Sequence, residues 1–193
     1  MARNPIVPMH SILSVLDEMK PQLAHFFRAK RFYDSRGWVG NINPSDFVES
    51  EPERFVHSFI ALSKKHTLRG FHFQDEPVAQ EKIVHVIQGQ ILDVSFRLDD
   101  TAVPPCTFHA YLGDDFESDT ALLASNLAHA YFVLSETAIL LYMNSAPYDA
   151  NLAQVINPLD EGIGFDWGVP TDRLIISDRD RAGMSLAKFR GFE

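Results

Sequence analysis

Cysteine and positive charge are both scarce in this sequence of 193 residues. A single cysteine, Cys106, excludes an internal disulfide and any zinc site built from several thiolates. Only 17 Lys and Arg stand against 26 Asp and Glu, which gives a formal net charge of −9. Binding of nucleic acid needs clustered cations that neutralise phosphates, so we expect no nucleic-acid partner.

Long apolar runs are absent as well. No segment approaches the length of a membrane span, and the N-terminus lacks the apolar core of a secretion signal. We therefore expect a cytoplasmic protein without a membrane partner. Hydrophobic residues nevertheless make up 46% of the sequence, and a chain of this length can bury a core without disulfides or a structural metal.

Short apolar segments, many of them rich in β-branched residues, dominate the sequence after residue 55. They recur at intervals of roughly 8–12 residues, which is typical of a β-sandwich or barrel. Between Ile91 and Leu98 apolar and polar residues alternate, which predicts a strand with one face on the core and one polar face. The predicted strands cover residues 55–62, 69–74, 83–87, 91–98, 108–112, 120–124, 130–134 and 138–143.

Helical signals are few and lie near the two ends of the sequence. Apolar residues fall at helical spacing over residues 11–19, and residues 178–189 are expected to form a short terminal helix. Periodicity does not decide between helix and strand for residues 23–32. No linker or repeat divides the chain, so we predict one domain over residues 1–193, of which residues 1–31 form an N-terminal arm.

The densest group of polar side chains lies in the segment Arg69-Gly70-Phe71-His72-Phe73-Gln74, with Lys82 shortly after it. A regular strand would place Arg69 on one face and both His72 and Gln74 on the other. A lone histidine between aromatic residues is most often a core residue bonded to the backbone, so this spacing alone does not define a site.

A series of motifs around this segment gives the sequence a family resemblance. After the segment come Ala79-Gln80-Glu81-Lys82-Ile83-Val84, Gly89 to Val94, Ala128-His129-Ala130-Tyr131 to Ser135, Leu141-Tyr142, Tyr148, Ile163 to Trp167 and Ile176 to Asp180; Asp34-Ser35-Arg36-Gly37 comes before it. In this order and spacing they resemble the signature of the dTDP-4-dehydrorhamnose 3,5-epimerases. The similarity runs from about Phe32 to the C-terminus, over residues 32–193.

The resemblance implies an all-β, cupin-type jelly roll that works as a homodimer on a nucleotide-diphosphate 4-keto-6-deoxy sugar. The expected reaction is epimerisation at carbon 3, carbon 5 or both. Removal of a hydrogen beside a ketone puts negative charge on the ketone oxygen, so the enzyme needs a base on one face of the sugar, a cation at the oxygen and an acid on the other face.

The resemblance also assigns these three parts to residues. His72 would be the base, since imidazole can accept a proton near neutral pH. Asp180 would hold the second ring nitrogen of His72, as a buried aspartate does for a catalytic histidine in hydrolases. Lys82 would stabilise the enolate and Tyr142 would return a proton from the opposite face. This scheme requires no metal and no organic cofactor.

Substrate-binding residues follow from the same matches. Guanidinium groups suit phosphate oxygens, so Arg36, Arg69 and Arg179 are expected to bind the diphosphate. Tyr148 matches an aromatic residue that stacks on the nucleotide base. The resemblance also places His129 near the substrate. The predicted binding residues are Arg36, His57, Arg69, Gln74, His129, Tyr148 and Arg179.

Structural explanations exist for several of these residues when each is taken alone. Tyr142 lies in an apolar segment where a buried tyrosine with a bonded hydroxyl is ordinary. Lys82 could be a solvated residue at the start of a strand, and Asp180 one of several surface charges. His129 could equally be a core or loop histidine.

Recognition positions depart from the family pattern more than the proposed catalytic ones do. His57-Ser58-Phe59 stands where the family often has Gln-x-Asn, and Phe59 cannot make the hydrogen bonds of an amide. Ala153 stands where an acidic contact is usual, and residues 121–127 lack a Trp-Ile-Pro element. We therefore expect a divergent member that acts on a different nucleotide-linked 4-keto sugar, with CDP, GDP or another carrier in place of dTDP, and that inverts one centre or both.

Two other functions fit parts of the sequence, and a third on the same fold fits it poorly. A sugar-nucleotide ketoisomerase on the same fold also moves protons beside a ketone. A non-catalytic cupin that binds sugar nucleotides is compatible with the altered recognition positions. A metal-dependent cupin oxygenase needs a His-x-His pair, and His72-Phe73-Gln74 lacks the second histidine.

Overall fold

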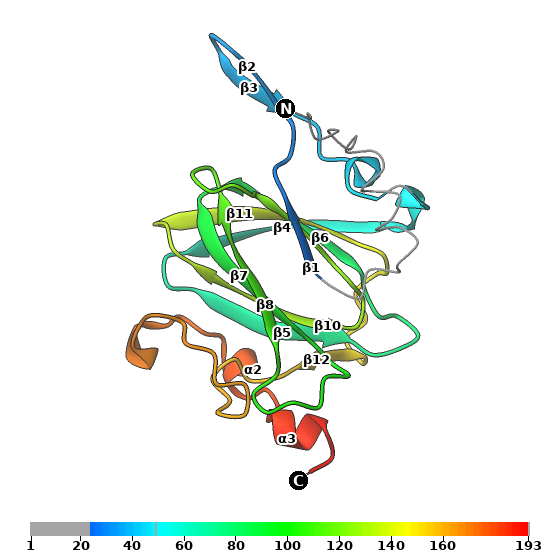
Figure 1. Ribbon diagram of the computed structural model, residues 1–193, viewed down its shortest axis with the longest axis vertical. Helices are drawn as coiled ribbons and strands as arrows, with labels where there is room; N and C mark the ends of the chain where they lie inside the picture. Colours follow the sequence, from blue (N-terminus) through cyan, green and yellow to red (C-terminus); the bar gives the residue numbers. More distant parts are fainter. Residues whose placement is uncertain (1–23, 49, 193) are drawn as a thin grey trace, which may run out of the picture.

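Two five-stranded antiparallel sheets face each other and form the body of the molecule (Figure 1). The computed structural model describes residues 24–48 and 50–192. In spatial order the first sheet consists of β1 (Ala24–Phe27), β9 (Thr120–Leu123), β6 (Lys82–Gln88), β11 (Thr137–Asn144) and β4 (His57–Lys64). The second sheet consists of β12 (Ala153–Val155), β5 (Leu68–Gln74), β10 (Leu127–Val133), β7 (Gln90–Arg97) and β8 (Thr107–Gly113). The predicted all-β jelly roll is confirmed, and every predicted strand has a counterpart.

Smaller elements surround the two sheets. A hairpin of β2 (Arg31–Asp34) and β3 (Gly37–Gly40) projects from one end of the molecule, and α2 (Asp178–Arg181) and α3 (Leu186–Phe189) lie toward the other end (Figure 1). Single 3-10 turns form η1 (Pro44–Asp46), η2 (Pro52–Arg54) and η3 (Thr171–Arg173).

Near the ends of the chain the structure corrects one predicted element and decides one that was open. The single terminal helix expected over residues 178–189 is instead two short helices, because Ser177 and Ser185 each cap a separate first turn. Residues 23–32, for which helix and strand were both open, contribute β1 and the start of β2, and β1 is part of the first sheet. The helix predicted over residues 11–19 lies outside the described residues. The division into an arm at 1–31 and a family-like region at 32–193 stays a prediction.

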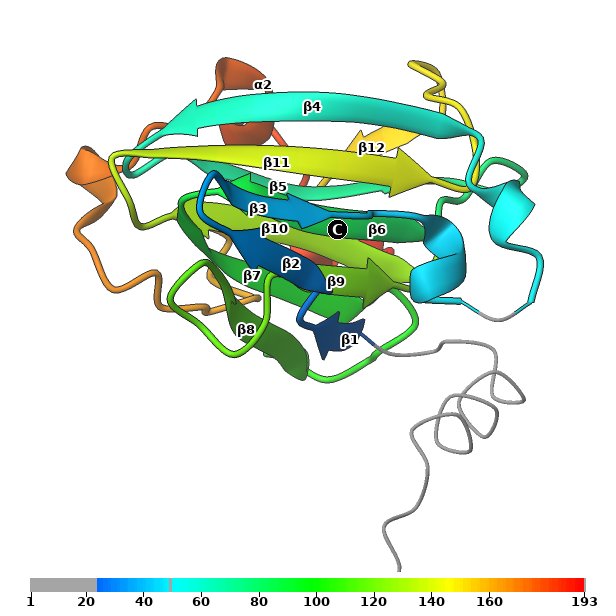
Figure 2. The same cartoon turned by 90° about the horizontal axis from the view of Figure 1, so that it is seen from above.

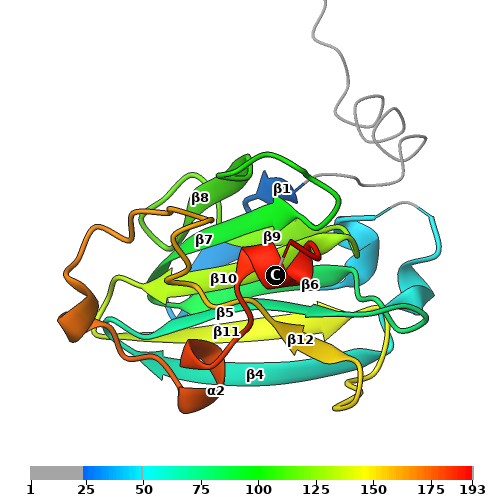
Figure 3. The same cartoon turned by 90° about the horizontal axis from the view of Figure 1, so that it is seen from below.

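The second sheet is covered on both faces, which corrects the prediction for residues 91–98. Its inner face meets the first sheet, and the segment after residue 155 packs across its outer face (Figure 3). Ile163, Trp167 and Leu186 from that segment contact the apolar side of β7 and its neighbours. The side of β7 expected to be polar and solvated faces the interior instead, and Asp93 and Ser95 on it are fully buried.

A bulge in β5 corrects the prediction for the faces of residues 69–74. Tyr131 pairs with Arg69 and His129 pairs with His72, so β5 contains one residue more than β10 between these two pairs. Gly70 takes up this extra residue at φ +136°, a conformation that glycine tolerates, and its backbone lies close against Ala130. The bulge brings Arg69 and His72 to the same side of the strand, where a regular strand would separate them.

Candidate active site

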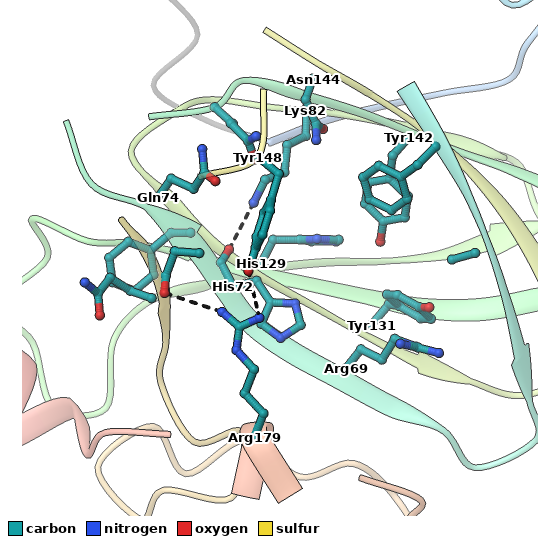
Figure 4. A pocket seen from close by; sticks show the side chains of 16 residues that line it. Arg69, His72, Gln74, Lys82, His129, Tyr131, Tyr142, Asn144, Tyr148 and Arg179 are labelled. Atoms are coloured by element: carbon teal, nitrogen blue, oxygen red, sulfur yellow. Dashed lines mark hydrogen bonds between the residues drawn. The ribbon is translucent and has the colours of Figure 1, made fainter. Parts of the chain in front are cut away.

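A cavity of about 250 Å³ opens between the two sheets and collects most of the predicted site residues (Figure 4). Strands from both sheets line it. The second sheet contributes Arg69, His72 and His129, and the first sheet contributes Lys82 and Tyr142. The other lining residues are Phe59, Ala61, Phe73, Gln74, Gln80, Tyr131, Asn144, Tyr148, Ala153, Gln154 and Arg179.

His72 and Asp180 form a hydrogen-bonded pair. The Nε2 atom of His72 lies 2.8 Å from Oδ1 of Asp180, which α2 holds behind the ring. A carboxylate can only accept, so Nε2 carries the proton and Nδ1 is the basic nitrogen. Burial acts to raise the pKa of Asp180, but hydrogen bonds from His72 and from the Gly70 N–H outweigh it and leave that pKa below its usual value. Asp180 is only 3% exposed, which excludes the alternative that it is one of several surface charges.

His129 forms a second pair of the same kind. It is the cross-strand neighbour of His72, and its Nε2 donates to Oδ2 of Asp93 on β7 at 2.7 Å. The ring is buried in this pair yet lines the cavity, so His129 faces the space in which a substrate would lie. Asp93 was not among the predicted site residues. Its only signal in the sequence was a carboxylate between apolar Leu92 and Val94 within a predicted strand.

Lys82 reaches the cavity from the first sheet. Its Nζ donates a hydrogen bond of 3.0 Å to the backbone carbonyl of His72, which links the two sheets across the site. Burial lowers the pKa of Lys82 from 10.5 to about 8, although the nearby charge of Asp93 opposes the change. Lys82 is 7% exposed, so it is not a solvated strand-entry residue.

Tyr142 lies on β11, in the sheet that faces His72. Burial raises the pKa of its phenol well above 10, and Tyr131 and Asp93 act in the same direction while Arg69 opposes them. The phenol therefore stays protonated at neutral pH and can donate a proton. The ring of Tyr142 stacks on Phe59, with 4.6 Å between ring centroids.

Arg69 is held in place by a chain of polar groups. Its Nε donates to Oγ of Ser63 at 3.1 Å, and Ser63 shares a hydrogen bond of 2.9 Å with the Tyr131 hydroxyl. Burial raises the pKa of Tyr131. Neither Ser63 nor Tyr131 was predicted as a site residue, because their contact joins β4 to β10 across the two sheets.

Tyr148 and Arg179 lie together at the mouth of the cavity (Figure 4). Arg179 donates from Nη1 to the Tyr148 hydroxyl at 3.2 Å, and from Nη2 to the Ala153 carbonyl at 3.4 Å. A guanidinium group beside an aromatic ring suits an anion attached to a flat base. Both residues were predicted to bind substrate, and the structure brings them together.

Gln74 lines the cavity, but its amide is already bonded. It donates to the carbonyls of Val78 and Pro147, and its oxygen accepts from the Asp149 N–H at 2.8 Å. These bonds hold the loop that carries Tyr148. Gln74 therefore positions this loop, and its predicted contact with the substrate stays a prediction.

Arg36 and His57 do not line the cavity. Arg36 lies in the turn of the β2–β3 hairpin, where it is exposed and forms an ion pair of 2.6 Å with Asp34. His57 begins β4, with its ring centroid 6.0 Å from that of Phe59. Their predicted substrate contacts are not made within the pocket of this one chain.

The described residues contain neither a candidate metal site nor a candidate membrane-spanning helix. Over 24–48 and 50–192, no cluster of three His, Cys, Asp or Glu side chains could hold a metal ion. No helix in that part of the chain is long and apolar enough to cross a membrane. The cofactor-free scheme and the cytoplasmic location stay predictions.

A jelly roll that holds a His–Asp pair opposite a buried phenol and ammonium group has the parts of a cupin-type sugar epimerase. Residues 21–188 match the sequence profile of the dTDP-4-dehydrorhamnose 3,5-epimerases. The chain belongs to this family. The predicted family and the predicted class of activity, an isomerase that acts on carbohydrates, are confirmed.

Relatives with solved structures or assigned names agree. The chain is 35% identical over 163 residues to a dTDP-4-dehydrorhamnose 3,5-epimerase of Mycolicibacterium smegmatis, which covers 80% of this chain and 77% of that protein. It is 30% identical to a dTDP-4-dehydrorhamnose 3-epimerase of Streptomyces niveus, over 72% of this chain and 66% of that protein. A 4-keto-6-deoxy sugar epimerase from the novobiocin gene cluster of Streptomyces spheroides superposes with a TM-score of 0.74 at 28% identity, covering 86% of this chain and 83% of that one.

Proposed function

We propose that the protein inverts carbon 3, carbon 5 or both of a nucleotide-linked 4-keto-6-deoxyhexose. The observation that carries this proposal is the placement of His72 and Tyr142, which enter one cavity from facing sheets. A sugar ring lying between them has a base on one side and an acid on the other, which is what inversion beside a ketone requires. The named activities of the relatives support the same reaction.

In this reaction the Nδ1 atom of His72 takes a proton from the carbon beside the ketone. Asp180 fixes the tautomer and stabilises the imidazolium that forms. Lys82 places an ammonium group near the developing enolate oxygen, and a preorganised donor of this kind contributes about 3 kcal/mol in other enzymes. Tyr142 then returns a proton from the opposite side.

Arg69, Arg179 and Tyr148 are proposed to hold the nucleotide diphosphate. Arg179 and Tyr148 touch at the mouth of the cavity, and Arg69, which also lines it, is oriented by its hydrogen bond to Ser63. This arrangement gives an acidic chain a local concentration of guanidinium groups, which bind phosphate oxygens in pairs. Stacking on Tyr148 tolerates different bases, so the carrier is the least restricted part of the substrate.

We also propose that two copies of the chain form a homodimer in which the hairpin of one copy reaches the cavity of the other. The hairpin carries exposed Phe32, Tyr33 and Trp38, and β4 presents exposed Ile60 and Leu62 along the free edge of the first sheet (Figure 2). Exposed apolar groups of this kind are typical of association surfaces. A hairpin that enters a second copy would bring Arg36 to a substrate that it cannot meet in its own chain.

The reaction is tested by following deuterium in heavy water. The protein is incubated with several nucleotide-linked 4-keto-6-deoxyhexoses, and NMR reports deuterium at carbons 3 and 5 and the configuration of each. Deuterium with inversion supports the epimerase. A displaced carbonyl indicates a ketoisomerase, and no exchange with any substrate indicates a binding protein.

Two variants assign the roles of base and acid. We expect His72→Ala to abolish exchange, because no other group is placed to take the proton with the help of Asp180. We expect Tyr142→Phe to keep exchange and lose inversion. Normal exchange by the His72→Ala protein would show that the base is another residue.

A further inference from the structure

The stack between Phe59 and Tyr142 is a contact that the reaction scheme above does not use. The two residues are direct cross-strand partners on β4 and β11, and both side chains point toward the cavity. Their ring centroids are 4.6 Å apart and their planes differ by only 4°. Such a parallel pair restrains the ring of Tyr142 over one whole face.

A second aromatic contact restrains Tyr142 from the facing sheet. The ring of His129 meets it edge-on, with centroids 6.2 Å apart and planes inclined by 60°. His129 is itself fixed by its hydrogen bond to Asp93. Tyr142 therefore rests against Phe59 within its own sheet and against an anchored imidazole across the cavity.

Phe59 also separates Tyr142 from solvent. β4 is the edge strand of the first sheet, so nothing in the described residues pairs with it on its outer side. Phe59 is 43% exposed whereas Tyr142 is 6% exposed. The benzyl ring of Phe59 thus takes up the solvent-facing position and covers one face of the Tyr142 ring.

We propose that Phe59 is a positioning residue that holds the phenol of Tyr142 in one orientation toward the cavity. This proposal rests on the function proposed above, in which Tyr142 returns the proton. An acid must meet its target at hydrogen-bond distance, and an error of about 1 Å in placement can cost roughly 100-fold in rate. Phe59 therefore acts on the second half of the reaction, the proton return, and not on proton removal by His72.

The test compares four proteins: wild type, Phe59→Leu, Phe59→Tyr and Ser58→Leu. Leucine keeps an apolar side chain but removes the stack, whereas tyrosine keeps a ring. Ser58 is the neighbouring residue on β4 and is exposed on the other face of the strand. Ser58→Leu therefore introduces the same leucine side chain away from the cavity and serves as the control.

Each protein is incubated in heavy water with the nucleotide-linked 4-keto-6-deoxyhexose that the wild type exchanges fastest in the assay above, and exchange and inversion are measured separately. We expect Phe59→Leu to retain deuterium exchange near the wild-type rate while inversion falls roughly 10- to 100-fold. We expect Phe59→Tyr and Ser58→Leu to keep the wild-type ratio of inversion to exchange. A merely structural role would lower both rates together, and that result would overturn the proposal.

A second measurement does not depend on turnover. Tyrosine labelled with ¹³C at Cζ gives resonances for the five tyrosines of the chain, and the Tyr142 signal is identified by its loss in Tyr142→Phe. Phe59→Leu should change the chemical shift of this resonance, because the ring current of Phe59 is gone. Phe59→Tyr keeps a ring at this position, so its Tyr142 resonance should lie close to the wild-type chemical shift. An unchanged Tyr142 resonance in Phe59→Leu overturns the role of Phe59, whereas a wild type that exchanges no substrate overturns the proposed function.

Discussion

At the scale of single residues, the site places a charged lysine where burial disfavours it. Lys82 is 7% exposed, and burial lowers its pKa from 10.5 to about 8. The site therefore holds a cation at a cost in folding free energy, a pattern that is common where activity and stability conflict. An enolate bound beside Lys82 would offset this cost, because it adds a second opposite charge to that of Asp93.

This pKa leads to a prediction about stability and pH. Below pH 8 the lysine is charged in both the folded and the unfolded chain, and the difference between 10.5 and about 8 corresponds to about 3 kcal/mol of destabilisation. We expect Lys82→Met to abolish exchange and to raise the free energy of unfolding at pH 7 by up to about 3 kcal/mol.

The extra free energy of unfolding of Lys82→Met should decrease as the pH rises. Between about pH 8 and 10.5 the folded wild type has released the proton that its unfolded chain still binds, so the wild type gains stability as pH rises. The difference between the variant and the wild type should therefore shrink above pH 8 in denaturant titrations. A constant or growing difference would mean that burial does not lower the pKa of Lys82 in the folded protein.

Which residues gather at the cavity was largely predictable from motifs, and so was the contact between His72 and Asp180, whereas most of the other contacts were not. His72, Lys82, Tyr142 and Asp180 were recognised from residue types at fixed spacing, and the structure gathers them around one cavity. Asp93 was missed, because the sequence does not indicate that a segment more than sixty residues later covers the other face of its strand. Burial of a strand on both faces is a tertiary property.

At the scale of elements, the bulge in β5 decides which side chains enter the site. Alternation within residues 69–74 predicted that Arg69 and His72 lie on opposite faces, and this is wrong because β5 has one residue more than β10 at Gly70. A register shift depends on the partner strand, so it leaves little trace in the periodicity of its own strand. Strand existence was predictable here, and side-chain direction was not.

A pair of glycine substitutions tests the importance of this bulge. Gly70 and Gly37 have nearly the same φ, +136° and +132°, but a Cβ on Gly70 would lie 2.3 Å from the Cβ of Ala130, whereas a Cβ on Gly37 would meet nothing within 4 Å. We expect Gly37→Ala to cost about 1–3 kcal/mol of stability from backbone strain alone.

Gly70→Ala should lower the free energy of unfolding by roughly 1–3 kcal/mol more than Gly37→Ala does, since β5 and β10 must also move apart. That movement would shift Arg69 and His72, so exchange should fall in Gly70→Ala even under conditions where the protein stays folded. Thermal unfolding and the heavy-water assay measure the two effects. Equal stability of the two variants would show that the close approach of β5 to β10 is relaxed at little cost.

At the scale of the whole molecule, the position of Arg36 requires an explanation. The hairpin that carries it projects away from the two sheets, while Asp180 lies on α2 toward the other end (Figure 1). An arginine so placed cannot bind the diphosphate of its own chain by a local rearrangement. The proposed homodimer resolves this conflict, because the hairpin then serves the cavity of the partner.

Mixed dimers test this arrangement directly. Arg36→Ala and His72→Ala should each be inactive alone, for different reasons. In a mixed dimer, the Arg36→Ala copy keeps its own His72 and receives an intact Arg36 from its partner, so one complete site forms. Random pairing makes half of the dimers mixed, each with one complete site, so co-expression should restore about a quarter of wild-type exchange. Recovery is the expected result. Its absence, with dimers verified by light scattering, would place Arg36 outside the substrate site and leave the hairpin as an association element alone.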